Sequence, residues 1–189
     1  MRRIIVALGA TALLSVPAVA RAGTLPSDHP ANAHASVAGP GAVKRGPSGI
    51  AYLPGLLNLQ PTPSGTWVDS ALQVTLPRAG TYSLDADVRG RLAGVPPINA
   101  FIVARLWNVT SGTVVPNSAR IITQLADLSD AGAAALNTTA PISERISVGG
   151  PTTIRLQGVR FNASGATTVA EIRSDASGLT SLRFEQTGP

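Results

Sequence analysis

Asp85 and Asp87 are the residues whose type and spacing come closest to those of a catalytic pair. In an extended strand, residues i and i+2 point to the same side and lie roughly 6.5–7 Å apart. That spacing falls within the range of about 5–9.5 Å found between the two acids of glycosidases. Arg89 and Arg91 continue the same side of the strand. Neighbouring cations keep both carboxylates ionised, whereas acid–base catalysis needs one of them protonated. The pattern therefore disfavours a hydrolase.

Other catalytic or metal-binding chemistry has few candidate residues. The chain contains no cysteine and only two histidines, His29 and His34, so a Ser-His or Cys-His pair within the later strands is excluded. Asp28 with the two histidines could hold a metal weakly, but a Pro/Gly-rich segment is not preorganised for it. Asp127 and Asp130 supply oxygens suited to calcium without a recognisable ligand loop. We predict a non-enzymatic protein with no metal and no cofactor.

The first 22 residues have the three parts of a secretory signal peptide. Arg2 and Arg3 precede an uncharged run over residues 4–20, and Ala20-Arg21-Ala22 provides a small-x-small cleavage site. No second apolar stretch of comparable length follows. We therefore expect a secreted, extracellular protein with no membrane span after cleavage of residues 1–22.

The charge of the predicted mature chain argues against nucleic acid as a partner. Removal of Arg2, Arg3 and Arg21 leaves 12 of the 15 basic residues against 10 acidic ones. No cluster of cations remains that could follow a phosphate backbone. The preference for arginine over lysine, with abundant alanine and glycine, is typical of a GC-rich bacterial source.

Two further segments follow the signal peptide. Residues 23–47 are rich in Pro, Gly and Ala without periodicity, which predicts a disordered tail. Residues 48–189 contain short alternating runs rich in Val, Ile and Thr, separated by turn residues. This pattern predicts an all-β domain of about eight to ten strands, arranged as an antiparallel sandwich or barrel. Within it, only residues 124–138 have a composition that allows a short helical turn in a long loop.

The order of these runs resembles the jelly roll of the tumour necrosis factor superfamily. The resemblance is carried by TWVDSALQVTLPRAGTYSLDADVR, FIVARLWNVTSGTVV, TTIRLQGVRF and the ending SGLTSLRFEQTGP, and it covers about residues 65–189. Within that superfamily, the chain is most similar to bacterial versions of the globular head of the complement recognition collagens. The resemblance implies an antiparallel two-sheet jelly-roll sandwich. It also implies a binding protein without catalytic activity that packs as a homotrimer through the face of its inner sheet.

If the family register applies, strands 81–91, 152–161 and 179–186 share that inner sheet. Their apolar positions, such as Leu84, Leu156 and Leu182, would then face the core. Their polar positions would form the subunit interface: Asp85, Asp87, Arg89, Arg155, Gln157, Arg183 and Glu185. A solvated sheet face on a monomer would show the same alternation. The partner is thus a second and third copy of the chain, with a cell-surface protein or glycan as a further binding partner.

A carbohydrate-binding monomer is the alternative function. Trp67 and Trp107 are the side chains best able to stack on a sugar ring, and Arg105 lies beside the second in sequence. Tryptophan is more often largely buried than exposed, so the sequence favours packing roles for both rings. Exposure of either ring beside Arg105 would favour the binding site.

Overall fold

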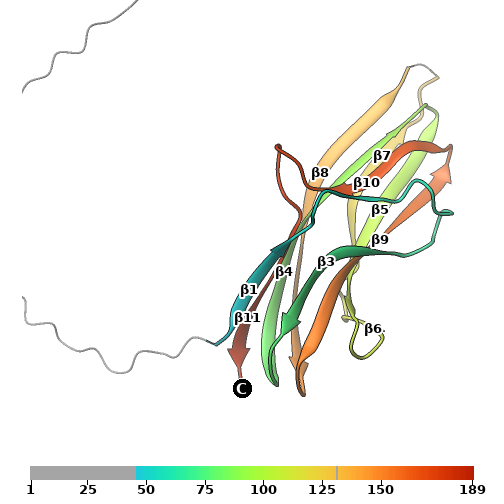
Figure 1. Cartoon of the computed structure of the whole chain (residues 1–189). Coiled ribbons are helices and arrows are strands. Elements are labelled where there is room, and N and C mark those ends of the chain that lie inside the picture. The colour runs from blue at the N-terminus through green and yellow to red at the C-terminus, as the bar shows by residue number, and fades with distance from the viewer. Residues whose placement is uncertain (1–45, 131) are drawn as a thin grey trace, which may run out of the picture. The chain divides into compact units, whose positions relative to one another are not determined.

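The computed structural model describes residues 46–130 and 132–189. The predicted signal peptide 1–22 and nearly all of the predicted tail 23–47 lie outside the described residues, as do Asp28, His29 and His34. The described part is an all-β domain (Figure 1). None of its segments forms a helix long and apolar enough to cross a membrane.

Eleven strands make up this domain. In chain order they are β1 (Ser48–Tyr52), β2 (Leu56–Asn58), β3 (Val68–Leu76), β4 (Gly80–Gly94), β5 (Ile98–Asn108), β6 (Thr113–Val114), β7 (Arg120–Asp127), β8 (Ala134–Val148), β9 (Thr152–Ser164), β10 (Thr167–Arg173) and β11 (Ser181–Gly188). Turn residues of the types expected from the sequence, such as Gly112 and Gly165 with positive φ, separate them.

The strands form two antiparallel sheets. Sheet A contains β1, β11, β4, β10 and β2 with β8 beside β4, and sheet B contains β3, β9, β5 and β6 with β7 beside β5. The chain crosses repeatedly between the sheets: β3 lies in sheet B, β4 in sheet A, β5 to β7 in sheet B, β8 in sheet A, β9 in sheet B, and β10 and β11 in sheet A. This arrangement is a jelly-roll sandwich, as the sequence predicts.

Strand β4 organises sheet A. On one side, β8 pairs with it along its whole length, from Gly80 opposite Val148 to Gly94 opposite Ala134. On the other side, β11 pairs with the first half of β4 and β10 with the second half. Strands β10 and β11 therefore lie end to end along the same side of β4, separated by the loop 174–180. Strands β1 and β2 form the sheet edge in the same way, because β1 pairs with β11 and β2 with β10.

The core lies between the sheets and is filled by the alternate apolar residues of each strand. Leu84 and Val88 of β4 have no exposed surface, nor have Ile154 and Leu156 of β9, and Ala86 and Leu182 are also buried. Phe184 is partly buried against this cluster. The inward face predicted for these strands is confirmed. Because side chains alternate with period 2, burial of one set leaves the intervening residues on the outer face of each sheet.

Two sequence expectations about the fold are wrong. The described residues of 124–130 and 132–138 contain no helical turn, since β7 continues to Asp127 and β8 begins at Ala134. Local composition favoured a helix weakly, but pairing of β8 along all of β4 outweighs that preference. The long strand β9 also belongs to sheet B, between β3 and β5, and does not share a sheet with β4 and β11.

Candidate functional site

Four of the predicted interface residues lie together on the outer face of sheet A. Cross-strand pairing places Arg183 opposite Asp85, and Glu185 lies further along the same side of β11. Arg183 Nη2 lies 3.3 Å from Asp87 Oδ2, and both side chains are about half exposed, at 52% and 53%. Asp85 accepts hydrogen bonds from the hydroxyl groups of Ser83 and Ser143. We call this outer surface of sheet A the charged face.

A depression of about 420 Å³ opens on the charged face next to the sheet edge. Its lining combines acidic, basic and apolar groups: Gly46, Ser48, Gly49, Ile50, Asp85, Arg183, Phe184 and Glu185. The structure thus brings three of the predicted interface residues around one hollow, together with an exposed side chain of β1.

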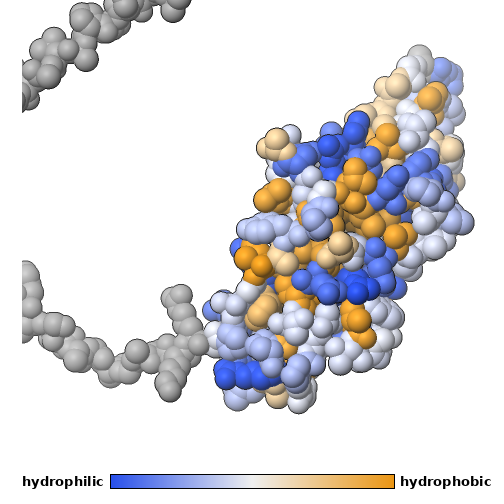
Figure 2. All heavy atoms as spheres, viewed as in Figure 1, coloured by the Kyte–Doolittle hydropathy of each residue, from blue (hydrophilic) through white to orange (hydrophobic). Residues whose placement is uncertain are grey.

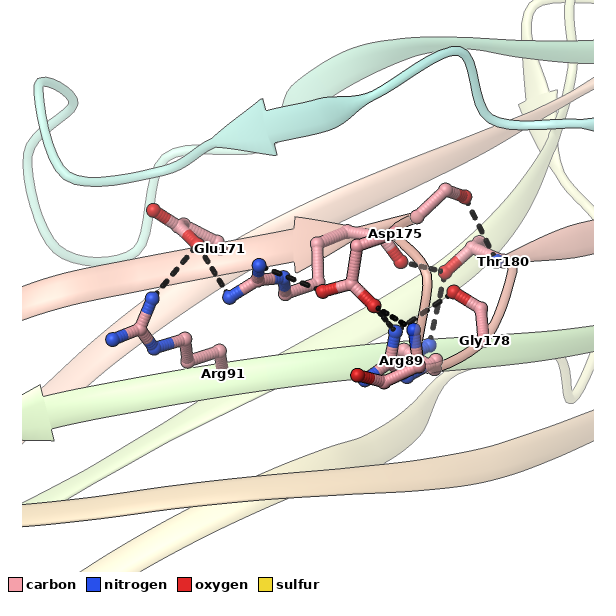
Figure 3. A network of polar contacts seen from close by, with 9 residues as sticks. Arg89, Arg91, Glu171, Asp175, Gly178 and Thr180 are labelled. Atoms are coloured by element: carbon pink, nitrogen blue, oxygen red, sulfur yellow. Dashed lines mark hydrogen bonds and ion pairs between the residues drawn. The ribbon is translucent and has the colours of Figure 1, made fainter.

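Arg89 has a different role from that of its neighbours. Its Nη1 donates to Asp175 Oδ1 at 2.6 Å and to the carbonyl oxygen of Gly178 at 2.7 Å. The Arg89 side chain is only 14% exposed. Figure 3 shows these contacts holding the loop 174–180 against β4. Arg89 is thus engaged within its own chain, which the sequence could not show because its partners are distant along the chain.

The same network continues along β10. Arg173 Nη2 lies 2.7 Å from Asp175 Oδ2, and its Nη1 lies 3.7 Å from Glu171 Oε2. Arg91 Nη1 reaches the same glutamate at 4.0 Å (Figure 3). The hydrogen bond from Arg89, followed by one from the backbone N–H of Ser177, lowers the pKa of the Asp175 carboxyl. Alternating charges therefore fix the loop 174–180 at the junction between β10 and β11.

Apolar side chains border this network. Ile50, Tyr52 and Leu56 project from the edge strands and Leu179 from the loop 174–180, and each is between 48% and 54% exposed. The backbone N–H of Leu53 donates to the carbonyl of Thr180, which brings the edge strands next to the loop. Figure 2 shows hydrophobic groups interspersed with strongly hydrophilic ones on the visible side. Such exposed apolar side chains near one another are typical of contact surfaces.

Arg155 and Gln157 do not belong to the charged face. Both project from β9 on the outer face of sheet B, so the prediction that they share one surface with Asp85 is wrong. Period-2 alternation shows which residues share a strand face, but it does not show which sheet the strand joins. Arg155 Nη1 instead donates to Asp69 Oδ2 at 2.8 Å, and Gln157 Nε2 donates to Asp69 Oδ1 at 2.7 Å.

The three predicted ligand-binding residues come together on this second surface. The guanidinium carbon of Arg105 lies 3.8 Å from the ring centroid of Trp67 and 5.2 Å from that of Trp107. Both rings are half-buried on the outer face of sheet B, and neither fills the core between the sheets. Burial lowers the pKa of the Arg105 guanidinium, and the charge of Asp69 partly opposes that effect.

A pair of phenylalanines on the same surface was missed by the sequence analysis. Phe101 of β5 stacks on Phe161 of β9 with ring centroids 5.0 Å apart and an angle of 24° between the planes. The sequence carried a sign of this surface, because the segment 100–108 has large apolar residues on both faces of its strand. We call the surface formed by Trp67, Phe101, Arg105, Trp107 and Phe161 the aromatic face.

The loop acids show no arrangement that would hold a metal. Among the residues that the structure describes, no group of three or more His, Asp or Glu side chains comes together. Asp127 Oδ1 accepts the backbone N–H of Ser129, and hydrogen bonding to Ser129 lowers the pKa of the Asp127 carboxyl. This short contact has the form of a turn that is stabilised by an aspartate.

No protein-family model and no curated protein sequence matches the chain. Similar solved structures are those of infectious bursal disease virus. The structure of its Gt strain is 14% identical, with a TM-score of 0.45, covering 76% of this chain and 32% of that one. The crystal structure of the VP2 subviral particle of this virus is 13% identical, with a TM-score of 0.45 and coverage of 76% and 33%. The chain spans about a third of the length of these proteins.

Proposed function

We propose that the chain is a secreted, non-enzymatic binding and structural module that assembles into a homotrimer through its charged face. The observation that carries the proposal is the meeting of four half-exposed apolar side chains with a network of both charge signs on one sheet surface. Assembly as a trimer follows from the resemblance of the sequence to bacterial proteins of the tumour necrosis factor superfamily with complement-type globular heads.

The charges of this surface suit a copy of the same chain as the partner. Five acidic and five basic residues project from it or border it: Asp85, Asp87, Glu171, Asp175, Glu185, Arg89, Arg91, Arg145, Arg173 and Arg183. Because the surface carries equal numbers of acidic and basic groups, the acids of one copy can pair with the bases of a neighbouring copy. Such pairing can fix the register in which the two copies meet. The apolar border supplies the area that such an interface needs to exclude water.

The outer face of strand β8 allows a second copy of the chain to approach closely. Its outward residues are mostly small, namely Ala135, Asn137, Thr139, Pro141, Ser143, Arg145 and Ser147. They leave the sheet surface beside Asp85 low and flat, and Pro141 removes one backbone donor from this exposed edge strand. The edge is therefore protected against strand pairing, while its face stays accessible.

Sedimentation equilibrium or light scattering tests the assembly. We expect a mass about three times that of one chain at micromolar concentration. The variant Ile50→Arg, which places a cation in the apolar border, should dissociate the trimer. Its control is Ile121→Arg on β7, since Ile121 is 56% exposed but belongs to sheet B, whereas Ile50 is 48% exposed on sheet A. A strict monomer, or equal dissociation by both variants, would contradict the proposed interface.

A further inference from the structure

Strand β5 has an outer face unlike that of a strand exposed only to water. Its outward residues Phe101, Val103 and Trp107 are large and apolar, and all three are half-buried. The outward residues of β4 from Ser83 to Arg91 are all polar. An antiparallel sheet with one solvated face normally alternates apolar and polar residues. The outer surface of sheet B is therefore adapted to contact something other than water.

Arg105 is held on this aromatic face by contacts with several neighbouring side chains. Its guanidinium lies over the Trp67 ring, and its Nε donates to Gln157 Oε1 at 2.7 Å. Gln157 is only 8% exposed, and its amide nitrogen in turn donates to Asp69. The chain of contacts uses side chains from β5, β9 and β3, so the orientation of the guanidinium is set by three neighbouring strands.

The terminal nitrogens of Arg105 remain available as donors. Within the described residues, its side chain makes one hydrogen bond, through Nε. The planar guanidinium has four further N–H groups, and a pair of them matches the two oxygens of a carboxylate. Because two indole rings lie within 3.8 and 5.2 Å of the guanidinium carbon, an anion bound there would be partly shielded from water, which strengthens the contact.

The local charge favours a singly charged anion. Arg105 and Arg155 contribute two cations to the aromatic face, and Asp69 contributes one anion within hydrogen-bond distance of Arg155. The remaining positive charge attracts a carboxylate, whereas Asp69 would repel the second charge of a phosphate monoester. The Asp69 side chain is 53% exposed. Its oxygens can therefore also accept hydrogen bonds from hydroxyl groups of a ligand.

We propose that the Trp67–Arg105–Trp107 site binds an acidic sugar, a hexuronate residue of a polysaccharide. Its carboxylate would pair with the terminal nitrogens of Arg105, its ring would lie against Trp107, and its hydroxyls would meet Asp69 and Gln73. Gln73 accepts hydrogen bonds from Arg155 and so lies on the same surface. The site lies on sheet B and does not depend on assembly through sheet A.

Intrinsic fluorescence offers a site-specific measurement, because both tryptophans of the chain lie in the site. Purified protein would be titrated with trigalacturonate and with a glucuronate oligosaccharide. Fully methyl-esterified trigalacturonate is the matched control, since it keeps the rings and hydroxyls but loses the carboxylate charge. We expect saturable fluorescence changes with at least one acidic ligand and affinity for the ester weaker by about tenfold or more.

Variants test whether the Arg105 guanidinium recognises the carboxylate of the sugar. Arg105→Lys keeps the positive charge but loses the planar fork and should weaken binding by about tenfold or more. Arg78→Lys, on an exposed residue in the turn between β3 and β4, should leave binding unchanged. If Arg105→Lys unfolds the protein, Trp107→Phe takes its place and should weaken binding of the acidic sugar several-fold. Both variants are checked by circular dichroism.

Four results would overturn the proposal. The first is the absence of a saturable signal with either acidic ligand up to about 10 mM, and the second is equal affinity for the acid and its ester. The third is unchanged binding in a folded variant of the site. The fourth is tighter binding of an acetylated peptide carboxylate than of the uronates. The mass of the protein is measured in the same sample, so failure of the homotrimer is seen separately from failure of sugar binding.

Discussion

The two outer faces of the sandwich differ in how their side chains are held. On the charged face, the ion pair between Asp87 and Arg183 joins two half-exposed groups, although Arg89 of the same face is only 14% exposed. On the aromatic face, one guanidinium lies among rings and is bonded to a buried amide. Exposed ion pairs contribute little free energy, whereas a desolvated donor and acceptor pair is costly to break. Arg183 on the charged face and Arg105 on the aromatic face therefore differ in energetic weight.

The largest effect should come from the core that both sheets share. Leu84 of sheet A and Leu156 of sheet B are both fully buried. We expect Leu84→Ala and Leu156→Ala each to lower the free energy of unfolding by about 2–5 kcal/mol, because each leaves a cavity between the sheets. Urea unfolding measures both. A loss confined to one of the two would show that the sheets do not form one cooperative unit.

Arg105→Ala on the aromatic face should have the next largest effect. It removes the cation from the Trp67 ring and leaves the buried Gln157 without its donor, at a cost of about 2 kcal/mol in total. Urea unfolding at low and at high salt measures this cost, which should change little with salt because the partner of Arg105 is the uncharged amide of Gln157. A loss below about 0.5 kcal/mol would mean that the stacked arrangement is not maintained in solution.

Acid should loosen the loop 174–180 before it affects the rest of the domain. The pKa of Asp175 is lowered in the folded state by Arg89 and Ser177. The stabilisation is therefore fully present above the unfolded-state pKa of about 3.9 and is lost as the pH falls through the lower folded pKa. Amide hydrogen exchange at Ser177 and Gly178 should rise over this range. Asp175→Asn should remove most of this pH dependence, and a loop whose exchange does not respond would contradict the role given to Asp175.

The smallest effect is expected for the exposed pair on the charged face. Asp87→Asn should change the free energy of unfolding by no more than about 0.5 kcal/mol, since both partners are about half exposed. Thermal unfolding under conditions that keep the protein monomeric measures this value, with Ser143→Ala as a neighbouring control. A cost as large as that of Arg105→Ala would remove the energetic difference between the two faces.

The difference between the faces also explains what sequence reasoning could and could not find. The polar residues of β4 were recognised as one surface because they follow each other at period 2 on a single strand. The partners of Arg89, by contrast, lie in a loop between two later strands, and Phe161 lies on a strand far from Phe101 in the sequence. Alternation is a local property of the backbone, whereas these contacts depend on how strands pair.

The sequence by itself determined the all-β class, most of the longer strand segments, and the core-facing side of β4, β9 and β11. These properties follow from period-2 burial and turn chemistry, which act within a few residues. Tertiary structure alone decided that β9 joins sheet B, which separates Arg155 and Gln157 from Asp85 and brings Gln157 to Arg105. The physical reason is that sheet membership depends on backbone hydrogen bonds between distant strands, to which each residue contributes the same groups whatever its side chain.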